Sequence, residues 1–209
     1  MSWFNIGTDE VNEAESLYAP KVGSISGEHV VTIAQVYLME SGSSSAKALV
    51  VDYVHENGSR GTEKFWYINK DTGTEKKPDG TPTIGSLQVA NFFGAIKVKP
   101  ESVEPKRTMY KVFGQDKEVF AFPTLVGREV RVVVQMKEEE KYSDGSIIEV
   151  AEVIGWFDVK TRKNRKELAE DTDALQIEKD IKRSEKLRKM KAKKEPVSSK
   201  KEPEEERPW

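Results

Sequence analysis

Three segments rich in β-branched and aromatic residues constrain the fold of this chain more than any other feature. Residues 29–39 (HVVTIAQVYLM) and 46–55 (AKALVVDYVH) have the composition of strands. The dipeptide Asn57-Gly58 follows them and favours a tight hairpin turn. A third segment of the same kind, 62–69 (TEKFWYIN), comes directly after this turn. The pattern predicts three consecutive strands, of which the second and third are joined as a hairpin.

The periodicity then changes from strand to helix at residues 84–96 (IGSLQVANFFGAI). Thr83 stands where a residue that caps the helix N-terminus is expected, and Pro100 lies beyond the end of the segment. Apolar residues recur at spacings of three to five, as on one face of a helix: Ile84, Leu87, Phe92 and Ile96. We therefore expect one helix after the third strand.

Two further strands are predicted at 126–137 (VGREVRVVVQMK) and 147–157 (IIEVAEVIGWF), separated by a turn. The intervening segment, 101–124, has an irregular pattern with two or three short extended pieces. Three strands, a helix and two strands is the element order of the OB-fold, a five-stranded barrel that often binds oligonucleotides. We expect a mainly β protein built on such a barrel, with the helix between strands three and four.

Charge divides the chain into four regions. We expect an acidic N-terminal arm (1–27), an OB-fold nucleic-acid-binding domain (28–160), a charged helical segment (161–194) and a disordered acidic tail (195–209). From residue 179 to residue 194 nine Lys or Arg residues stand against two acids, whereas the last eight residues hold four glutamates and one arginine. The net charge of −2 conceals this segregation.

Composition argues against most enzyme classes. The chain has no cysteine and only two histidines, His29 and His55, which excludes disulfides and leaves little for zinc or acid–base chemistry. It has no glycine-rich phosphate loop and no apolar run long enough to cross a bilayer. We expect a cytoplasmic protein (host cytoplasm for a viral chain) that is not an enzyme and needs neither metal nor cofactor.

The stretch from about residue 27 to residue 99 resembles a family of phage single-stranded-DNA-binding proteins. Three blocks carry the resemblance: HVVTIAQVYLMESGSSSAKALVVDY, EKFWYINKDTG and TPTIGSLQVANFF. The acidic end of the chain is similar to the tails of bacterial and phage single-strand-binding proteins, although it has tryptophan last and an arginine inside the acidic run. The resemblance implies a protein that coats and protects single-stranded DNA in replication, recombination or repair, and that is able to form homo-oligomers.

The same resemblance implies that the tail recruits a polymerase, a helicase or primase, or an exonuclease. A terminal tryptophan on a disordered acidic string has no core to join, which favours docking into a partner. The predicted partner-binding residues are Glu204, Glu205, Glu206, Pro208 and Trp209.

Binding single strands without sequence preference needs aromatic platforms for bases and cations for phosphates. In the third strand Lys64 and Trp66 share one face, and Phe65 and Tyr67 share the other. Because Lys64 marks the wet face, we expect Trp66 to be the platform, with Lys70 close by. The alternative is that the whole aromatic cluster belongs to the core.

Further candidates for DNA binding lie outside the third strand. Tyr53 is expected on the same surface as Trp66, and Arg128 and Arg131 are candidates for phosphate contacts, as is Lys137. An ordinary charged exterior explains these arginines equally well. A second basic and aromatic cluster forms either a binding loop or a cover over the barrel mouth: Lys106, Arg107, Tyr110 and Lys111.

Two other functions fit the same features. A protein–protein adaptor would use the β-domain as a scaffold and the charged segments to recruit partners. A single-strand annealing protein or recombination mediator would bind strands as an oligomer and promote their pairing. Stacking platforms accept DNA and RNA alike.

Overall fold

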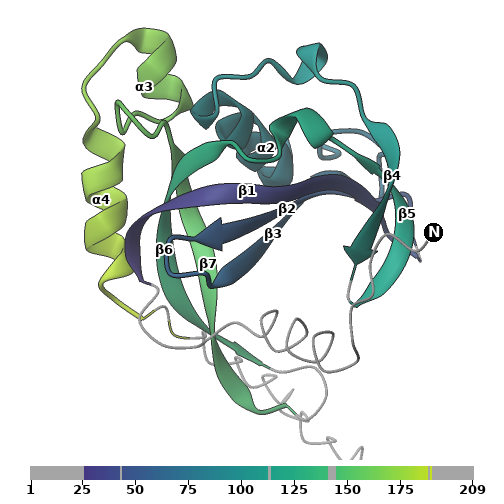
Figure 1. The fold of residues 1–209 in the computed structure, drawn as a ribbon, viewed down its shortest axis with the longest axis horizontal. Helices are drawn as coiled ribbons and strands as arrows, with labels where there is room; N and C mark the ends of the chain where they lie inside the picture. Colours follow the sequence, from purple (N-terminus) through teal and green to yellow (C-terminus); the bar gives the residue numbers. More distant parts are fainter. Residues whose placement is uncertain (1–25, 43, 113, 141–144, 188, 190–209) are drawn as a thin grey trace, which may run out of the picture.

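The computed structural model describes residues 26–42, 44–112, 114–140, 145–187 and 189. Within them the protein is mainly β, as expected, and seven strands form one open antiparallel sheet (Figure 1). The strands are β1 (Gly27–Glu40), β2 (Lys47–His55), β3 (Arg60–Ile68), β4 (Lys106–Val112), β5 (Gln115–Ala121), β6 (Glu129–Glu140) and β7 (Ile147–Phe157). The helices are α2 (Ile84–Ala95), α3 (Arg165–Glu170) and α4 (Leu175–Ser184), with short 3₁₀ turns η1 (Pro100–Ser102) and η2 (Pro123–Leu125).

Strand β1 organises the sheet because it pairs with three other strands. Strand β2 runs along one edge of β1. On the other edge, residues 27–32 pair with β6, whereas Tyr37 and Leu38 pair with β5. The β1–β2 register shifts between Ile33 and Gln35, which marks a bulge. A bulge bends its strand and increases the local twist, and Figure 1 shows β1 curving across the whole molecule.

The expected number of five strands is wrong for the described residues. Two extended pieces of the segment 101–124 pair with each other and form the hairpin β4–β5, which joins the sheet through β1. Among the described residues, β3 pairs only with β2 and β7 only with β6, so no ladder of backbone hydrogen bonds connects β3 to β7. The sheet is therefore open along this seam.

Helix α2 begins as the sequence predicts and packs against β3. The Thr83 side chain caps its N-terminus by accepting a hydrogen bond from the backbone N–H of Ser86. The predicted apolar face is wrong in its first turn, because Ile84 and Leu87 are 69% and 52% exposed. Gly85 makes the contact there instead, since its missing side chain lets the helix approach the backbone carbonyl of Trp66.

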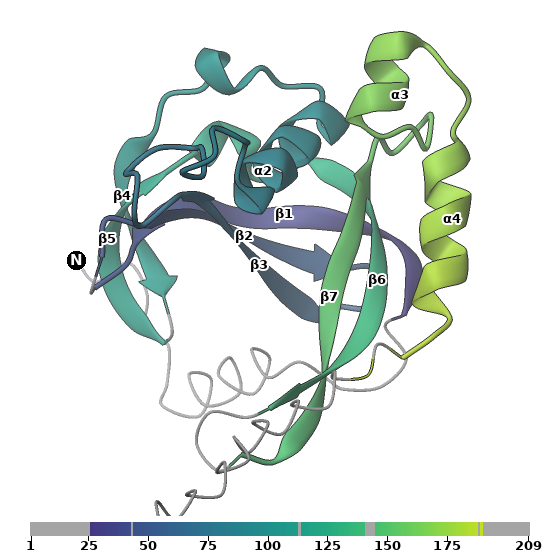
Figure 2. The same ribbon diagram turned by 180° about the vertical axis from the view of Figure 1, so that it is seen from behind.

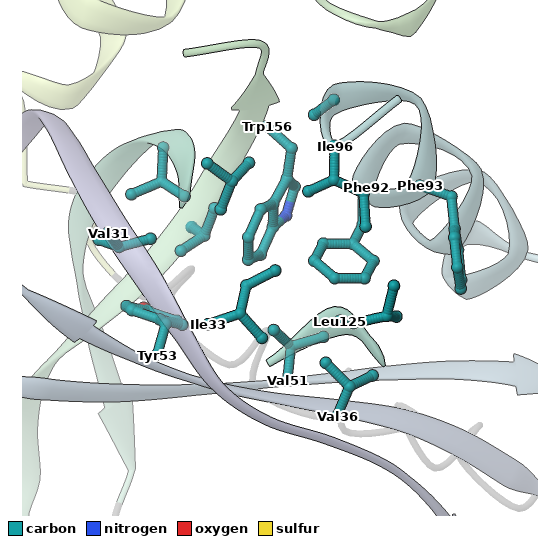
Figure 3. Packing of buried hydrophobic residues seen from close by; sticks show 14 of the residues in the cluster. Val31, Ile33, Val36, Val51, Tyr53, Phe92, Phe93, Ile96, Leu125 and Trp156 are labelled. Atoms are coloured by element: carbon teal, nitrogen blue, oxygen red, sulfur yellow. The ribbon is translucent and has the colours of Figure 1, made fainter. Parts of the chain in front are cut away.

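The main core lies between the curved sheet and α2. Trp156 of β7 packs edge-on against Phe65, Phe92 and Tyr53, with ring centroids 5.8, 5.2 and 6.2 Å away. Figure 3 shows Trp156 beside Phe92, with Ile33 close to both rings. Aromatic pairs in this geometry add stability beyond the area they bury. This cluster holds β7 close to β3 without backbone pairing.

Helix α4, which lies in the charged segment after β7, is docked on the sheet. Ile177 of α4 is fully buried against Val133 and Phe157. The Gln135 side-chain N–H groups donate to the backbone carbonyls of Arg183 and Lys186, at 2.8 and 2.9 Å, and so anchor the end of α4 to β6. Figure 2 shows α4 beside β6, at the opposite end of the molecule from the hairpin β4–β5. No helix in the described ranges is long and apolar enough to cross a membrane.

Candidate functional site

A groove with a volume of about 930 Å³ crosses the outer face of the sheet. Its floor comes from β2 and β3, with Asp52, Thr62, Lys64 and Trp66. The hairpin β4–β5 provides one wall. The other wall is the arm formed by β6 and β7 beyond Val134, where β6 no longer pairs with β1. Figure 1 shows this arm continuing past the rest of the sheet.

Alternation along β3 decides which side chains reach the groove. Thr62, Lys64 and Trp66 line its floor, whereas Phe65 is buried in the core. Glu63, on the same face of β3 as Phe65, also lines the groove, at the open seam beside β7. The predicted division of this strand is therefore confirmed: Lys64 and Trp66 share the open face, and Trp66 is 43% exposed. The small residue Ala48 lies opposite Trp66 on β2. Whether bases stack on this indole stays a prediction.

A second hollow of about 480 Å³ extends the groove beyond Trp66. Lys64 and Trp66 line both hollows, and the extension adds Lys70, Lys77 and Ile84. Lys70 forms an exposed ion pair with Asp71 at 2.7 Å. The concave surface is thus longer than the main groove, with the indole of Trp66 near its middle.

The hairpin β4–β5 separates the members of the predicted basic and aromatic cluster at 106–111. Lys111 lines the groove. Tyr110 packs edge-on against Tyr37, at 6.1 Å between ring centroids, and so helps to hold the hairpin on the outer face of β1. Arg107 lies 5.5 Å from the Phe120 ring and forms a long ion pair with Glu118. Lys106 and Arg107 do not line the groove.

The expectation that Tyr53 shares the surface of Trp66 is wrong. Tyr53 is only 3% exposed and packs in the main core (Figure 3). The reason is alternation along β2: Asp52 lies on the groove face, so its neighbour Tyr53 points the other way. Gly61 lies opposite on β3, and any side chain there would collide with the Tyr53 ring.

The two predicted phosphate-binding arginines lie away from the groove. The Arg131 guanidinium donates to Glu28 and to the backbone carbonyl of Val159, which places it beside the start of β1. Arg128 donates to the backbone carbonyl of Thr124 and lines a separate hollow of about 380 Å³. Arg131 thus holds structural elements together, while Lys137, on the same strand, does line the groove.

The charges around the groove are mixed. Lys64, Lys111 and Lys137 line it, together with four carboxylates: Asp52, Glu63, Glu139 and Glu152. Lys137 lies within 3.4 Å of Glu152 and 3.6 Å of Glu139, so much of its charge is balanced. The groove is therefore not a uniformly basic cleft.

Burial weakens the negative charge of two of these carboxylates. The Glu63 side chain reaches across the open seam and accepts a hydrogen bond from the backbone N–H of Val153 at 2.9 Å. Burial, reinforced by nearby Glu152 and opposed by the hydrogen bond and by Lys137, raises the pKa of Glu63 to about 7. Burial likewise raises the pKa of Asp52, against its 2.6 Å hydrogen bond from Thr62.

Glu63 was missed by the sequence reasoning, although the sequence carries a signal for it. Glu63 lies two residues before Phe65, so the two side chains are expected on the same face of the strand, the face that fills the core. A carboxylate at a core-facing position needs a special partner, because burying a charge without one is costly. Here the partner is the unpaired backbone N–H of β7 at the open seam.

The structure bears little on the remaining predictions. The described ranges contain no group of three His, Cys, Asp or Glu residues placed to hold a metal. The five tail residues predicted to bind partners, Glu204 to Glu206, Pro208 and Trp209, lie outside the described residues. A scan against protein-family models and a search of curated proteins gave no match to this chain.

Proposed function

We propose that this chain binds single-stranded nucleic acid, in the first place DNA, along the groove. The observation that carries the proposal is the indole of Trp66, exposed on the groove floor beside Lys64. An aromatic ring next to a cation is what a single strand needs, because the base stacks and the phosphate pairs. A large aromatic side chain left exposed in a hollow also needs an explanation, since folding gains from burying it.

The arrangement of the strands supports an OB-like reading of the domain. Strands β1 to β3, helix α2 and strands β6 and β7 follow in the order of that fold, with the hairpin β4–β5 inserted. OB-folds bind oligonucleotides on the face of strands two and three, between flanking loops. The groove has its floor on β2 and β3 and is flanked by the hairpin and the β6–β7 arm. The position of the groove therefore agrees with this reading.

Mixed charge sets the expected character of the binding. With Lys64, Lys111 and Lys137 as the phosphate contacts, the affinity for a single strand should fall with salt at a logarithmic slope of about −2. Stacking then carries more of the affinity than charge does. In the cell, such a protein would coat and protect single strands in replication or recombination, and its acidic tail would recruit partner enzymes.

The test is binding of a fluorescently labelled oligothymidine of about 30 nucleotides, a length that spans several OB-fold site sizes. A duplex of the same length serves as the competitor. Trp66→Ala should lower the affinity roughly 5- to 150-fold, since one stacked base contributes about 1–3 kcal/mol. Phe120→Ala is the matched control, because Phe120 is exposed on the hairpin but does not line the groove.

Two outcomes would contradict the proposal. Equal affinity for single strand and duplex would leave only non-specific charge attraction and would favour the adaptor function. An unchanged affinity of Trp66→Ala would remove the stacking platform from the groove. Faster renaturation of complementary strands in the presence of the protein would instead assign it an annealing role on the same surface.

A further inference from the structure

A smaller cavity of about 230 Å³ lies beside the groove and is here called the side pocket. It shares Asp52, Thr62, Val150 and Ala151 with the lining of the groove. The side pocket is therefore within reach of a strand that lies in the groove.

Two buried polar atoms of the side pocket lack hydrogen-bond partners. Within the part of the chain that the structure describes, neither Gln35 Oε1 nor His55 Nδ1 has one, and both residues line this cavity. The large majority of buried side-chain polar atoms in proteins are hydrogen-bonded, and leaving one unpaired costs stability. Two such atoms at one small cavity indicate that something polar completes them.

The backbone of β1 is distorted where it supplies Gln35. The bulge between Ile33 and Gln35 places two residues, Ala34 and Gln35, in the lining of the side pocket. On the neighbouring strand, Asp52 lies opposite Gln35 and lines the pocket as well. Bulges often lie next to functional sites, where they redirect side chains. The unpaired amide oxygen is thus set at the pocket by a specific feature of the strand.

Size and chemistry restrict what the side pocket accepts. Its volume is below the range of roughly 300–1,000 Å³ that drug-sized ligands occupy, so it suits a single flat ring system rather than a whole nucleotide. Ala34, Val150 and Ala151 give it apolar walls, and Tyr53 adds an aromatic one. Burial and the neighbouring His29 lower the pKa of His55, so its imidazole is neutral at pH 7.

We propose that the side pocket takes one base of the strand bound in the groove, with Gln35 and His55 hydrogen-bonding to the polar edge of that base. Every nucleobase offers an N–H donor for the amide oxygen of Gln35, and a ring or carbonyl acceptor besides. The base turns away from the stack and fills an apolar pocket that ends in two unsatisfied polar groups. The inference rests on the proposed function, because it requires a strand in the groove.

The variant Gln35→Leu tests the inference, because it removes the unpaired oxygen and keeps most of the side-chain volume. It should lower the affinity for oligothymidine about threefold to tenfold, the effect of one hydrogen bond. It should leave the affinity for an abasic strand of equal length unchanged, because such a strand has no base to insert. Gln176→Leu, on α4 and outside the groove and the side pocket, is the matched control and should bind both strands as the wild type does.

A second measurement needs no variant. The fluorescent base 2-aminopurine is placed singly at successive positions of a strand shortened until it holds one protein in one register, and the wild-type protein is added. One position should brighten, since a base that leaves its stacked neighbours loses their quenching. Uniform fluorescence along the strand would overturn the inference and leave the side pocket to water.

The outcomes separate this inference from the function on which it rests. If the wild type does not prefer single strands, both fail. If Trp66→Ala weakens binding while Gln35→Leu binds both strands as the wild type does, only the side pocket is refuted. If thymidine monophosphate alone binds and Gln35→Leu abolishes its binding without changing strand affinity, the pocket serves free nucleotides and the assignment to a strand is wrong.

Discussion

The raised pKa of the Glu63 carboxyl leads to a quantitative prediction about how the free energy of unfolding depends on pH. Its pKa is raised from 4.5 to about 7 in the folded protein by burial. The unfolded chain ionises this group first as the pH rises above 4.5, so ionisation favours unfolding. The wild type therefore loses stability between about pH 4.5 and pH 7, and the shift corresponds to about 3 kcal/mol at one pKa unit per 1.4 kcal/mol.

Replacing Glu63 by glutamine removes this loss. The side-chain oxygen of Glu63→Gln still accepts the hydrogen bond from the Val153 N–H, but it carries no charge at any pH. The difference in unfolding free energy between variant and wild type should grow by about 3 kcal/mol from about pH 4 to pH 8. Urea unfolding at both pH values measures it, and groups that titrate equally in both proteins cancel.

Glu139→Gln is the matched control for this experiment. It makes the same chemical change in a groove-lining glutamate whose side chain is 56% exposed, and so shows what the loss of a glutamate charge does without burial. The same charge should act on binding: oligothymidine affinity of the wild type should rise as the pH falls from about 8 to 6, and that of Glu63→Gln should rise less. If the difference in unfolding free energy between Glu63→Gln and the wild type stays constant across the pH range, the raised pKa of the Glu63 carboxyl is refuted.

Two further predictions concern the packing around the groove. Gly85→Ala should cost about 3 kcal/mol of stability, because the new Cβ would collide with the backbone carbonyl of Trp66. Thermal unfolding measures this loss. Gly42→Ala is the control, because Gly42 has open space around it. Arg131→Met should cost about 2 kcal/mol by breaking charged hydrogen bonds to Glu28 and Val159. Its affinity for single strands should not change, whereas Lys64→Met should weaken binding with little loss of stability; the reverse pattern would restore Arg131 as a phosphate contact.

Local patterns in the sequence predict the elements well. The β-branched segments become β1, β2, β6 and β7, and the Asn57-Gly58 turn forms with Gly58 at a φ of +80°. Thr83 caps α2 as expected. These features depend on backbone preferences and on side chains within a few residues, which a single sequence records directly.

Which face of a strand is exposed can be predicted only where a charged residue marks that face. Lys64 marks the open face of β3, and the period of two along a strand then places Trp66 beside it and Phe65 inside. On β2, Asp52 marks the open face in the same way, and the period of two places Tyr53 inside, against the expectation. In α2 the apolar spacing suggested that Ile84 is buried, but the close approach of Gly85 to β3 leaves it exposed.

The sequence by itself determined that this chain is mainly β, where β1, β2, β3, β6, β7 and the central helix α2 lie, and that Lys64 and Trp66 share a face. Only the tertiary structure decided that the segment 101–124 forms a hairpin wall, that Arg131 pairs with Glu28, and that Glu63 crosses the seam to Val153. The groove and the side pocket belong to this second group. Strand formation depends on neighbours along the chain, whereas each of these features joins segments far apart in sequence. Their contacts exist only after the sheet has curved around its core.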